Sequence, residues 1–367
     1  MKRIKEANCS KSFKGKAWRK GRFSDYEFHV EDGRISQGLK GEAIEASYIF
    51  PPFADPHIHG GWGLSFQKGE FGPLEKNLKS VGILFAVPTL YNDELRKIEQ
   101  ISKVFQSYKK KNPESIFPFL RVEGPFISRK KRGFQQEEFM LHPNEKNIEK
   151  FLSIEEIKVF TFAPELKGVE ELVQKALLKG KIPSVGHSNA KFQDLLKFYK
   201  MGIRHMTHFP NAMSSLHHRE IGLIGGGLFL KDLYLEVIAD GIHSCFDFIS
   251  LLLNVKGPNF AIISDMIPPA YSNRKKFGGQ ILKKDGKRRI SNAQGTLAGG
   301  CTSVSEQAQW LFQNGLTPDE IVHLACVTTM KYFGFRLPSI DEGEDASFVL
   351  LDKHMKVMEV YNHGERV

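Results

Sequence analysis

Two histidines stand one residue apart in segment 52–63, which reads Pro-Phe-Ala-Asp-Pro-His-Ile-His-Gly-Gly-Trp-Gly. Alternate residues of a β-strand point to the same face, so His57 and His59 would present their imidazoles on one side. Two nitrogen ligands at the end of a strand suit a metal ion. The alternative is two surface histidines on a loop, and the pair alone does not decide between these interpretations.

Other residues that can bind a metal or move a proton also follow apolar runs. Taken singly, each has a structural explanation, such as capping a helix, packing in a loop or making a turn. Their shared position at the ends of such runs is harder to explain by chance. The set consists of Glu123, His187, His208, Asp240, His243 and Asp265.

The residue types in this set indicate hydrolytic chemistry. Four imidazoles and one carboxylate suit Zn²⁺ or a similar transition metal, and a carboxylate can bridge two ions. Water bound to such an ion has a pKa near ~7, so hydroxide is available at neutral pH. Asp265 would serve as general base for that water and later as general acid for the leaving group. We therefore predict metal-assisted hydrolysis of a polar bond, and we favour an amide.

The elements that position these residues alternate between strand and helix. Eight apolar runs, most of them separated by helical patterns, over about 250 residues predict a (β/α)8 TIM-like barrel, whose active site lies at the carboxyl ends of the strands. An open doubly wound sheet is the competing fold, and the lack of Gly-x-Gly-x-x-Gly after the first run weakens it. The runs span residues 52–57, 83–89, 117–123, 159–163, 182–187, 204–208, 234–240 and 260–265.

Local signals predict several details of the connections. Asn92 is expected to cap a helix that continues to Phe105. Residues 317–320, Thr-Pro-Asp-Glu, have capping-box spacing with proline at the first helical position. The connection between the sixth and seventh strands shows no clear helix signal. Segment 274–289, with an Asp285-Gly286 turn, predicts an exposed basic hairpin.

Composition and charge bound the class of protein. The 367 residues, 41% apolar and 26% charged, suit one large globular domain plus a small one. We expect no signal peptide and no membrane partner, because no apolar run approaches the ~20 residues of a membrane span. Four cysteines without paired spacing fit a cytoplasmic protein. The net charge of +10 is scattered and accompanies no nucleic-acid-binding motif, so we expect no nucleic-acid partner.

Together these motifs resemble the N-acetylglucosamine-6-phosphate deacetylases of the amidohydrolase superfamily. His-x-His is common to many amidohydrolases, whereas Glu-Gly-Pro, Gly-His-Ser-Asn-Ala and His-x-x-Asn-Ala-Met are more specific. Both chain ends have strand patterns, and 344–352 resembles the superfamily's small β-sandwich. The resemblance implies a barrel at 51–335 and a sandwich made of 1–50 and 336–367. The matching segments are 53–61, 122–126, 185–190, 207–213, 238–243, 263–265 and 295–299.

The resemblance also implies roles for individual residues. Three residues would hold the ion common to the family, namely Glu123, His187 and His208. His57 and His59 match ligands of a second ion found in two-metal members. Asp265 matches the catalytic acid/base, and His243 contacts substrate and polarises the acetamide carbonyl. The other positions implied to bind the sugar phosphate are Asn211, Ala212, Arg219, Gln135 and Leu297.

One departure from the family pattern affects the substrate site. Relatives carry Lys-Gly-x-His after the Glu-Gly-Pro loop, and that histidine contacts substrate. Here the stretch is Arg132-Gly-Phe-Gln135, and glutamine can form hydrogen bonds but carries no charge. The basic residues 129–132 could compensate in phosphate recognition. Two further departures, Pro51-Pro52 and Thr328-Thr-Met-Lys331, are interpreted as structural.

The implied reaction converts N-acetyl-D-glucosamine 6-phosphate to D-glucosamine 6-phosphate and acetate, in amino-sugar catabolism. One or two divalent ions are implied, with zinc favoured over iron, manganese or cobalt, and relatives commonly form homodimers. Two alternatives stay open. The same machinery could act on a different N-acyl sugar or N-acyl amino acid, or the chain could bind a metal or sugar phosphate without turnover.

Overall fold

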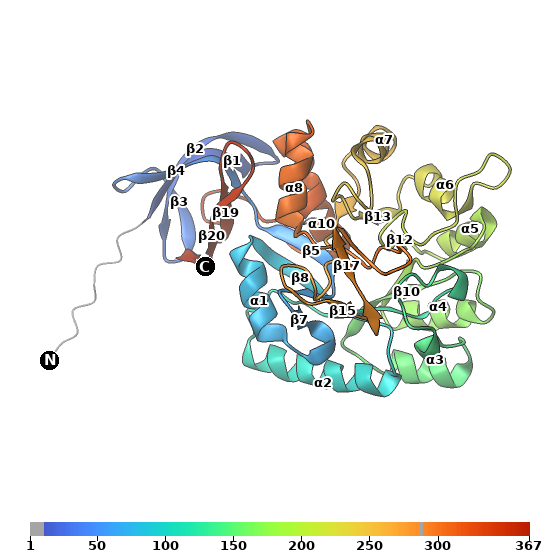
Figure 1. Ribbon diagram of the computed structural model, residues 1–367. Helices are drawn as coiled ribbons and strands as arrows, with labels where there is room; N and C mark the ends of the chain where they lie inside the picture. Colours follow the sequence, from blue (N-terminus) through green and yellow to red (C-terminus); the bar gives the residue numbers. More distant parts are fainter. Residues whose placement is uncertain (1–10, 286–288) are drawn as a thin grey trace.

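The computed structural model describes residues 11–285 and 289–367, and its larger part is a barrel of eight parallel strands surrounded by helices (Figure 1). Each strand coincides with one of the eight predicted runs. The backbone N–H of Asp265 donates to the carbonyl oxygen of His57 at 2.9 Å, so the segment after the last strand closes the barrel against the first. In order around the sheet, the strands are β5 (Phe53–Ile58), β8 (Ile83–Tyr91), β9 (Leu120–Phe126), β10 (Ile157–Phe162), β11 (Ile182–Val185), β12 (His205–Met206), β13 (Tyr234–Val237) and β14 (Ala261–Ile262).

Helices cover the outside of the barrel (Figure 1). The helix α6 occupies the connection where the sequence gave no clear signal, because three consecutive glycines obscure its pattern. A Cβ at Gly226 would lie 2.5 Å from Leu195, and one at Gly227 would lie 2.4 Å from Phe209, so close packing requires glycine there. The helices are α1 (Phe71–Ser80), α2 (Leu95–Lys111), α3 (Glu145–Leu152), α4 (Val169–Leu178), α5 (Phe192–Lys200), α6 (Gly222–Phe229), α7 (Phe246–Lys256), α8 (Val304–Gln313), α9 (Pro318–Val322) and α10 (Thr328–Phe333).

The capping predictions had different outcomes. Thr317 caps α9 and exchanges reciprocal hydrogen bonds with Glu320, which confirms the capping box. The prediction for Asn92 was wrong, because the residue before α2 is Glu94 and Asn92 is buried. The backbone N–H of Asn92 instead donates to Oε1 of Gln135 at 2.9 Å.

The predicted basic hairpin is two short hairpins. The first pairs β15 (Lys276–Phe277) with β16 (Gln280–Ile281), and the second pairs β17 (Lys283–Asp285) with β18 (Arg289–Ser291). The single-hairpin prediction was therefore incomplete, since a Gly278-Gly279 turn, with both φ angles positive, splits the segment. Gly286 lies outside the described residues, so the Asp285-Gly286 turn stays a prediction.

Strands from residues 12–50 and 348–366 form one seven-stranded sheet (Figure 1). Its core is aromatic: the Phe13 and Tyr361 ring centroids lie 4.9 Å apart, although two strands separate β1 from β20 in the sheet. Neighbouring strands are about 4.8 Å apart, so the sheet must curl over its own core. We propose the domain boundaries 1–50, 51–335 and 336–367. The strands are β1 (Ser12–Arg19), β2 (Arg22–Glu31), β3 (Arg34–Gln37), β4 (Ala43–Phe50), β19 (Phe348–Leu351), β20 (Val357–Asn362) and β21 (Glu365–Arg366).

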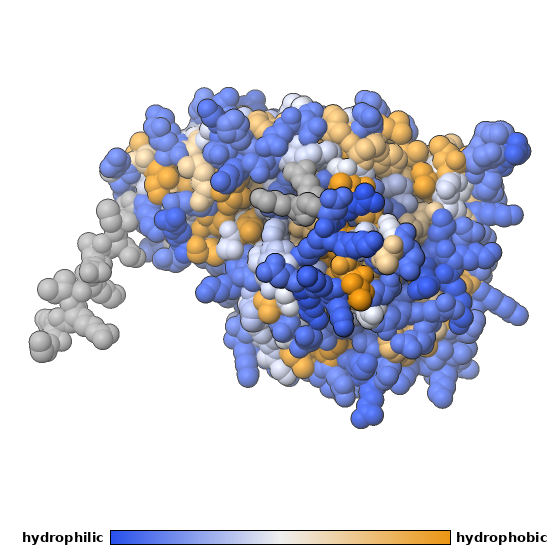
Figure 2. Space-filling view, in the orientation of Figure 1, coloured by the Kyte–Doolittle hydropathy of each residue, from blue (hydrophilic) through white to orange (hydrophobic). Residues whose placement is uncertain are grey.

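The helices of the described chain are too short or too polar to span a membrane. None of the helices in residues 11–285 and 289–367 combines the length and apolar character needed to cross a bilayer. Hydrophilic side chains cover most of the face shown in Figure 2, with smaller apolar areas between them.

A buried ion pair crosses the barrel interior beneath the carboxyl ends of the strands. Arg121 on β9 donates from Nη1 to Oε1 of Glu236 on β13 at 2.5 Å, and both side chains are fully buried. Arg121 also donates to Oγ1 of Thr207 at 2.9 Å, and Nε2 of His205 lies 2.9 Å from the same Glu236 oxygen. Although burial alone would raise the pKa of Glu236, Arg121 and His205 hold it well below its usual range.

Replacing Arg121 by Met should lower the free energy of unfolding by about 3–5 kcal/mol, because it leaves the buried Glu236 carboxylate without its arginine partner. Urea unfolding of the metal-free protein measures this loss. The double variant Arg121→Met/Glu236→Leu removes both charges and should lose less stability than the single variant. A single variant as stable as the wild type would show that the pair contributes nothing.

Candidate metal centre

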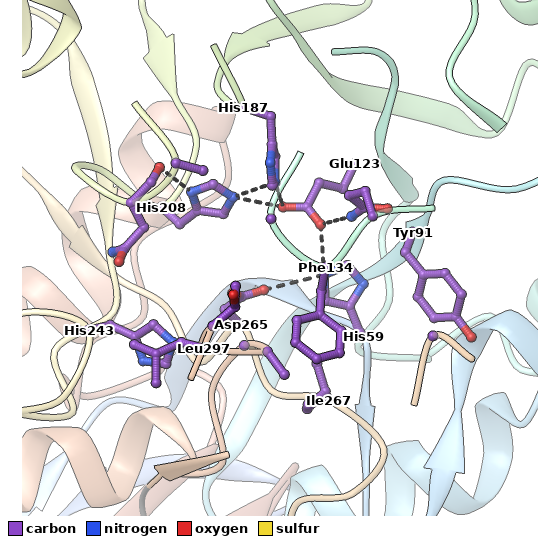
Figure 3. Close-up of a pocket in the computed structure, with 18 of the residues that line it drawn as sticks. His59, Tyr91, Glu123, Phe134, His187, His208, His243, Asp265, Ile267 and Leu297 are labelled. Carbon is purple, nitrogen blue, oxygen red and sulfur yellow. Dashed lines mark hydrogen bonds and ion pairs between the residues drawn. The ribbon is translucent and has the colours of Figure 1, made fainter. Parts of the chain in front are cut away.

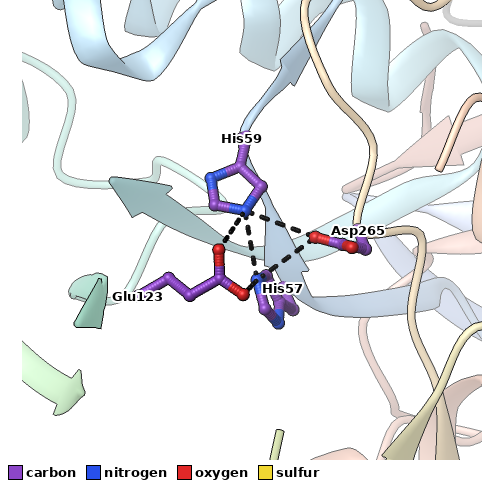
Figure 4. Close-up of side chains that lie close together, drawn as sticks. All are labelled: His57, His59, Glu123 and Asp265. Carbon is purple, nitrogen blue, oxygen red and sulfur yellow. Dashed lines mark hydrogen bonds and ion pairs between the residues drawn. The ribbon is translucent and has the colours of Figure 1, made fainter. Parts of the chain in front are cut away.

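Two groups of buried side chains that could hold a metal ion meet at Glu123, at the carboxyl ends of the barrel strands. Within each group, one ligand atom per residue lies within 4.8 Å of the others. Figure 4 shows His57, His59, Glu123 and Asp265 pointing toward one another. The first group is Glu123, His187 and His208, and the second is His57, His59, Glu123 and Asp265.

The first group is compact and uses one oxygen of Glu123. Oε1 of Glu123 lies 2.9 Å from Nε2 of His187 and 2.7 Å from Nε2 of His208. The two Nε2 atoms are 3.0 Å apart. Two nitrogens and one carboxylate oxygen are a donor set that zinc accepts, with further positions left for water or substrate. The side chains therefore fit a catalytic divalent ion.

The second group has spacings that match an ion-binding shell. Nε2 of His59 lies 3.4 Å from Oε2 of Glu123 and 3.3 Å from Oδ1 of Asp265. Nε2 of His57 is 3.3 Å from Nε2 of His59 and 3.4 Å from the same Asp265 oxygen. Ligands of a tetrahedral zinc at about 2.0–2.1 Å lie roughly 3.3 Å apart. These residues therefore fit a second divalent ion that shares Glu123 with the first.

The second ring nitrogen of three ligand histidines contacts a backbone carbonyl oxygen. Nδ1 of His59 lies 3.0 Å from Thr89 O, Nδ1 of His187 lies 2.8 Å from Lys131 O, and Nδ1 of His208 lies 3.1 Å from Asn211 O. A carbonyl can only accept, so each Nδ1 donates and each Nε2 keeps its lone pair for a metal when the ring is neutral. Nδ1 of His57 is buried, 3.6 Å from Oε2 of Glu236.

The backbone at three site residues is strained. The φ angles of His187, His208 and Asp265 are 45°, 30° and 44°, in the left-handed region that non-glycine residues rarely adopt. Such conformations cost of order 1–3 kcal/mol each and persist where the surrounding structure enforces them. Their occurrence at three candidate site residues supports a functional role for the side chains that they orient.

The charges of the site depend on each other. Burial alone would raise the pKa of Glu123, but His187, His208 and His59 hold it well below its usual range. Burial alone would lower the pKa of His59, but Asp265 and Glu123 outweigh it and raise that pKa to about 9. The pKa of His57 falls to about 4, through burial and the nearby Arg121. The site is therefore anionic at its carboxylates and attracts cations.

Metal binding should release protons at neutral pH. His59 has a pKa of about 9 in the metal-free site, so it is protonated at pH 7.5 and must lose its proton to bind an ion. For this proton, the affinity should fall up to tenfold per unit as pH drops below 9. Zinc titrations by calorimetry, in buffers of different ionisation enthalpy, count the released protons. Zinc uptake without proton release at pH 7.5 would contradict this expectation.

A pocket of about 380 Å³ opens beside the two ligand groups. Figure 3 shows candidate ligand residues such as Glu123 and Asp265 together with Tyr91, Phe134 and Leu297 among the residues that line it. Lys130 and Lys131 also line the pocket and bring positive charge to it. The combination of apolar walls, cationic side chains and acid/base groups suits a polar, anionic ligand.

Two pocket residues present polar atoms that have no hydrogen-bond partner among residues 11–285 and 289–367. Nδ1 of His243 is 2.8 Å from Oδ2 of Asp240, and its buried Nε2 has no hydrogen bond. Burial alone would lower the pKa of His243, but Asp240 and Asp265 raise it, which favours the imidazolium form with both N–H groups. Nδ2 of Asn211 is likewise buried without a partner. Because buried donors without partners are costly, both atoms are suited to a bound ligand.

Comparison with known proteins agrees with this geometry. Residues 48–366 match the amidohydrolase family. The chain belongs to this family. The N-acetylglucosamine-6-phosphate deacetylase of Bacillus subtilis is 31% identical over 356 residues, which cover 90% of this chain and 89% of that protein. The N-acetylgalactosamine-6-phosphate deacetylase of Escherichia coli O157:H7 is 25% identical, with 94% and 95% covered. The structure of the Thermotoga maritima N-acetylglucosamine-6-phosphate deacetylase is 30% identical with a TM-score of 0.87, covering 97% of this chain and 98% of that one.

This amidohydrolase brings most of the predicted substrate residues to one pocket. Asn211, Ala212, His243, Gln135 and Leu297 all line it. Arg219 is exposed and is not among the residues that line the pocket in the described part of the chain. Its Nη1 atom lies 3.0 Å from Nε2 of the neighbouring His218. The Gln135 side chain is bonded to Glu123 and Asn92, so its amide is already engaged within the protein.

Other pocket residues of the amidohydrolase were not among the predicted site residues. Tyr91 ends β8, and Phe277 enters from β15 to meet it, with ring centroids 5.2 Å apart. Tyr91 could have been found by extending the strand-end rule to the second strand. Phe277 lies in the basic insert, and no spacing in the sequence connects it to the barrel end.

Proposed function

We propose that this chain deacetylates N-acetyl-D-glucosamine 6-phosphate and releases D-glucosamine 6-phosphate and acetate. The observation that carries the proposal is the pair of ligand groups sharing Glu123 beside a pocket that also holds Asp265 and His243. The relatives named for this reaction support the choice of substrate. The reaction belongs to amino-sugar catabolism.

The proposed reaction assigns a task to each residue. A divalent ion bound to these ligands would polarise the acetamide carbonyl and acidify water. The carboxylate of Asp265, whose Oδ1 lies 3.3 Å from Nε2 of His59, accepts a proton from the attacking water and delivers it to the departing amine nitrogen. The Nε2–H group of His243 donates to the carbonyl oxygen as negative charge develops there. Asp240 holds His243 in the required orientation.

We propose that Lys130 and Lys131 face the phosphate, and the phosphate contact expected for Arg219 stays a prediction. Both lysines line the pocket, whereas Arg219 is exposed outside the described lining. Ammonium groups pair with phosphate through charge-assisted hydrogen bonds. Asn211 and Ala212 would contact the sugar, and Leu297 would cover it.

Three finer statements complete the proposal. The ions are zinc, because the ligand groups combine imidazole and carboxylate at suitable spacing. The chain acts as a homodimer, which would cover exposed apolar residues beside α6 such as Leu216 (55% exposed) and Phe229 (68% exposed). It works in the cytoplasm, where an exposed free thiol such as that of Cys245 stays reduced.

Acetate release tests the proposal. The zinc-loaded protein should release acetate from N-acetylglucosamine 6-phosphate, and more slowly from unphosphorylated N-acetylglucosamine. Release no faster than the blank from the phosphorylated sugar would refute the proposed function. Similarity to the E. coli N-acetylgalactosamine-6-phosphate deacetylase makes N-acetylgalactosamine 6-phosphate the second candidate substrate. The same assay compares acetate release from the two phosphorylated sugars.

A further inference from the structure

The side chain of Gln135 forms one hydrogen bond to Glu123 of the ligand groups and one to the backbone directly after β8. Its Nε2 donates to Oε2 of Glu123, and its Oε1 accepts from the backbone N–H of Asn92 at 2.9 Å. A backbone N–H can only donate, so the amide cannot be flipped, and its NH₂ group must face Glu123. With 7% exposure, Gln135 is also shielded from competing water.

The two oxygens of Glu123 have different nearest neighbours. Oε1 lies within 2.9 Å of His187 and His208 and 3.8 Å from Nε2 of His57, whereas Oε2 lies 3.4 Å from Nε2 of His59. A carboxylate that serves both groups must hold its plane, because rotation about its terminal bond would move Oε2 away from the second group. The N–H group of Gln135 meets the oxygen of the second group and opposes that rotation.

We propose that Gln135 is a positioning residue that holds Glu123 as a carboxylate shared by both ligand groups. This inference rests on the proposed metal-dependent function. It gives position 135 a task within the protein, where the family pattern has a histidine that contacts substrate. Partners that orient a metal ligand typically contribute 10–100-fold to metal affinity.

Metal affinity of the full-length protein tests the inference. Gln135→Met removes both hydrogen bonds and keeps an unbranched side chain of similar length. Zinc titration against a competing chelator should show 10–100-fold weaker binding of the ion held by His57, His59, Glu123 and Asp265. The ion held by Glu123, His187 and His208 should change less. Gln136→Met is the matched control, because Gln136 lines the same pocket beside Gln135.

Folding and activity are measured separately. Gln135→Asn keeps the amide but is one methylene too short to span both partners, so it should weaken the same ion even if the Met variant folds poorly. Circular dichroism of the metal-free variants reports the fold. The inference would be overturned if both variants kept the wild-type zinc affinity, or if both ions were weakened equally. It would also be overturned if Gln136→Met had an equal effect, or if the wild type bound one zinc per chain. If the Gln135 variants bind zinc more weakly as expected but the wild-type protein shows no deacetylase activity, only the proposed function would be refuted.

Discussion

Replacing Glu123 by Gln should remove both ions and reduce acetate release to the blank. Glu123 is the residue common to the two ligand groups, and its oxygens face His187 and His208 on one side and His59 on the other. The amide has the same shape but lacks the negative charge that balances the imidazole-bound ions. Elemental analysis of the purified, zinc-equilibrated variant measures the metal content.

The matched comparison is the double variant His57→Asn/His59→Asn. It removes two ligands of the second group only, so it should keep the ion held by Glu123, His187 and His208. One zinc per chain in this variant, against none in Glu123→Gln, is the expected pattern. Two zinc ions retained by Glu123→Gln would contradict the shared carboxylate.

Replacing Asp265 by Asn should lower kcat about 10²–10⁴-fold, the usual contribution of a general acid/base. Oδ1 of Asp265 lies 3.4 Å from Nε2 of His57 and 3.3 Å from Nε2 of His59, at the edge of the pocket. Asparagine keeps the shape of the side chain and cannot accept and return a proton. Steady-state acetate release and zinc content are measured on the same preparation.

The outcome separates a catalytic role from a ligand role. The ion held by Glu123, His187 and His208 does not use Asp265, so it should stay bound in Asp265→Asn. Asp240→Asn is a useful control, because it disturbs the orientation of His243 without touching the ligand groups, and its rate loss should be smaller. An Asp265→Asn protein with a normal rate would exclude Asp265 as the acid/base.

The sequence predicts which residues form the site because histidines and carboxylates stand at the ends of the apolar runs that become strands. The β-strand period predicts that His57 and His59 share a face, and the structure places His57 near the carboxyl end of β5 and His59 directly after it. Glu123 and His208 also lie at the ends of apolar runs. A barrel places the carboxyl ends of all its strands on one face, so residues at these ends lie close together. The structure brings all of these side chains together.

Contacts between distant segments could not be predicted in this way. Gln135 lies 43 residues from Asn92, and neither residue carries a local signal for their hydrogen bond. Arg121 and Glu236 are charged residues inside mostly apolar strands, and their pairing depends on which strands face each other across the barrel. Arg219 is exposed and does not line the pocket in the described part of the chain. Its position depends on the path of a loop, and the hydrophobic periodicity of the sequence does not predict that path.

Zinc titration of the metal-free protein, with acetate release from N-acetylglucosamine 6-phosphate recorded at each step, tests the central claim most directly. The metal-free chain should be inactive, and activity should appear with the first equivalent of zinc, as the group formed by Glu123, His187 and His208 fills. Full activity without zinc, or no acetate release at any zinc concentration, would contradict a metal-dependent deacetylase.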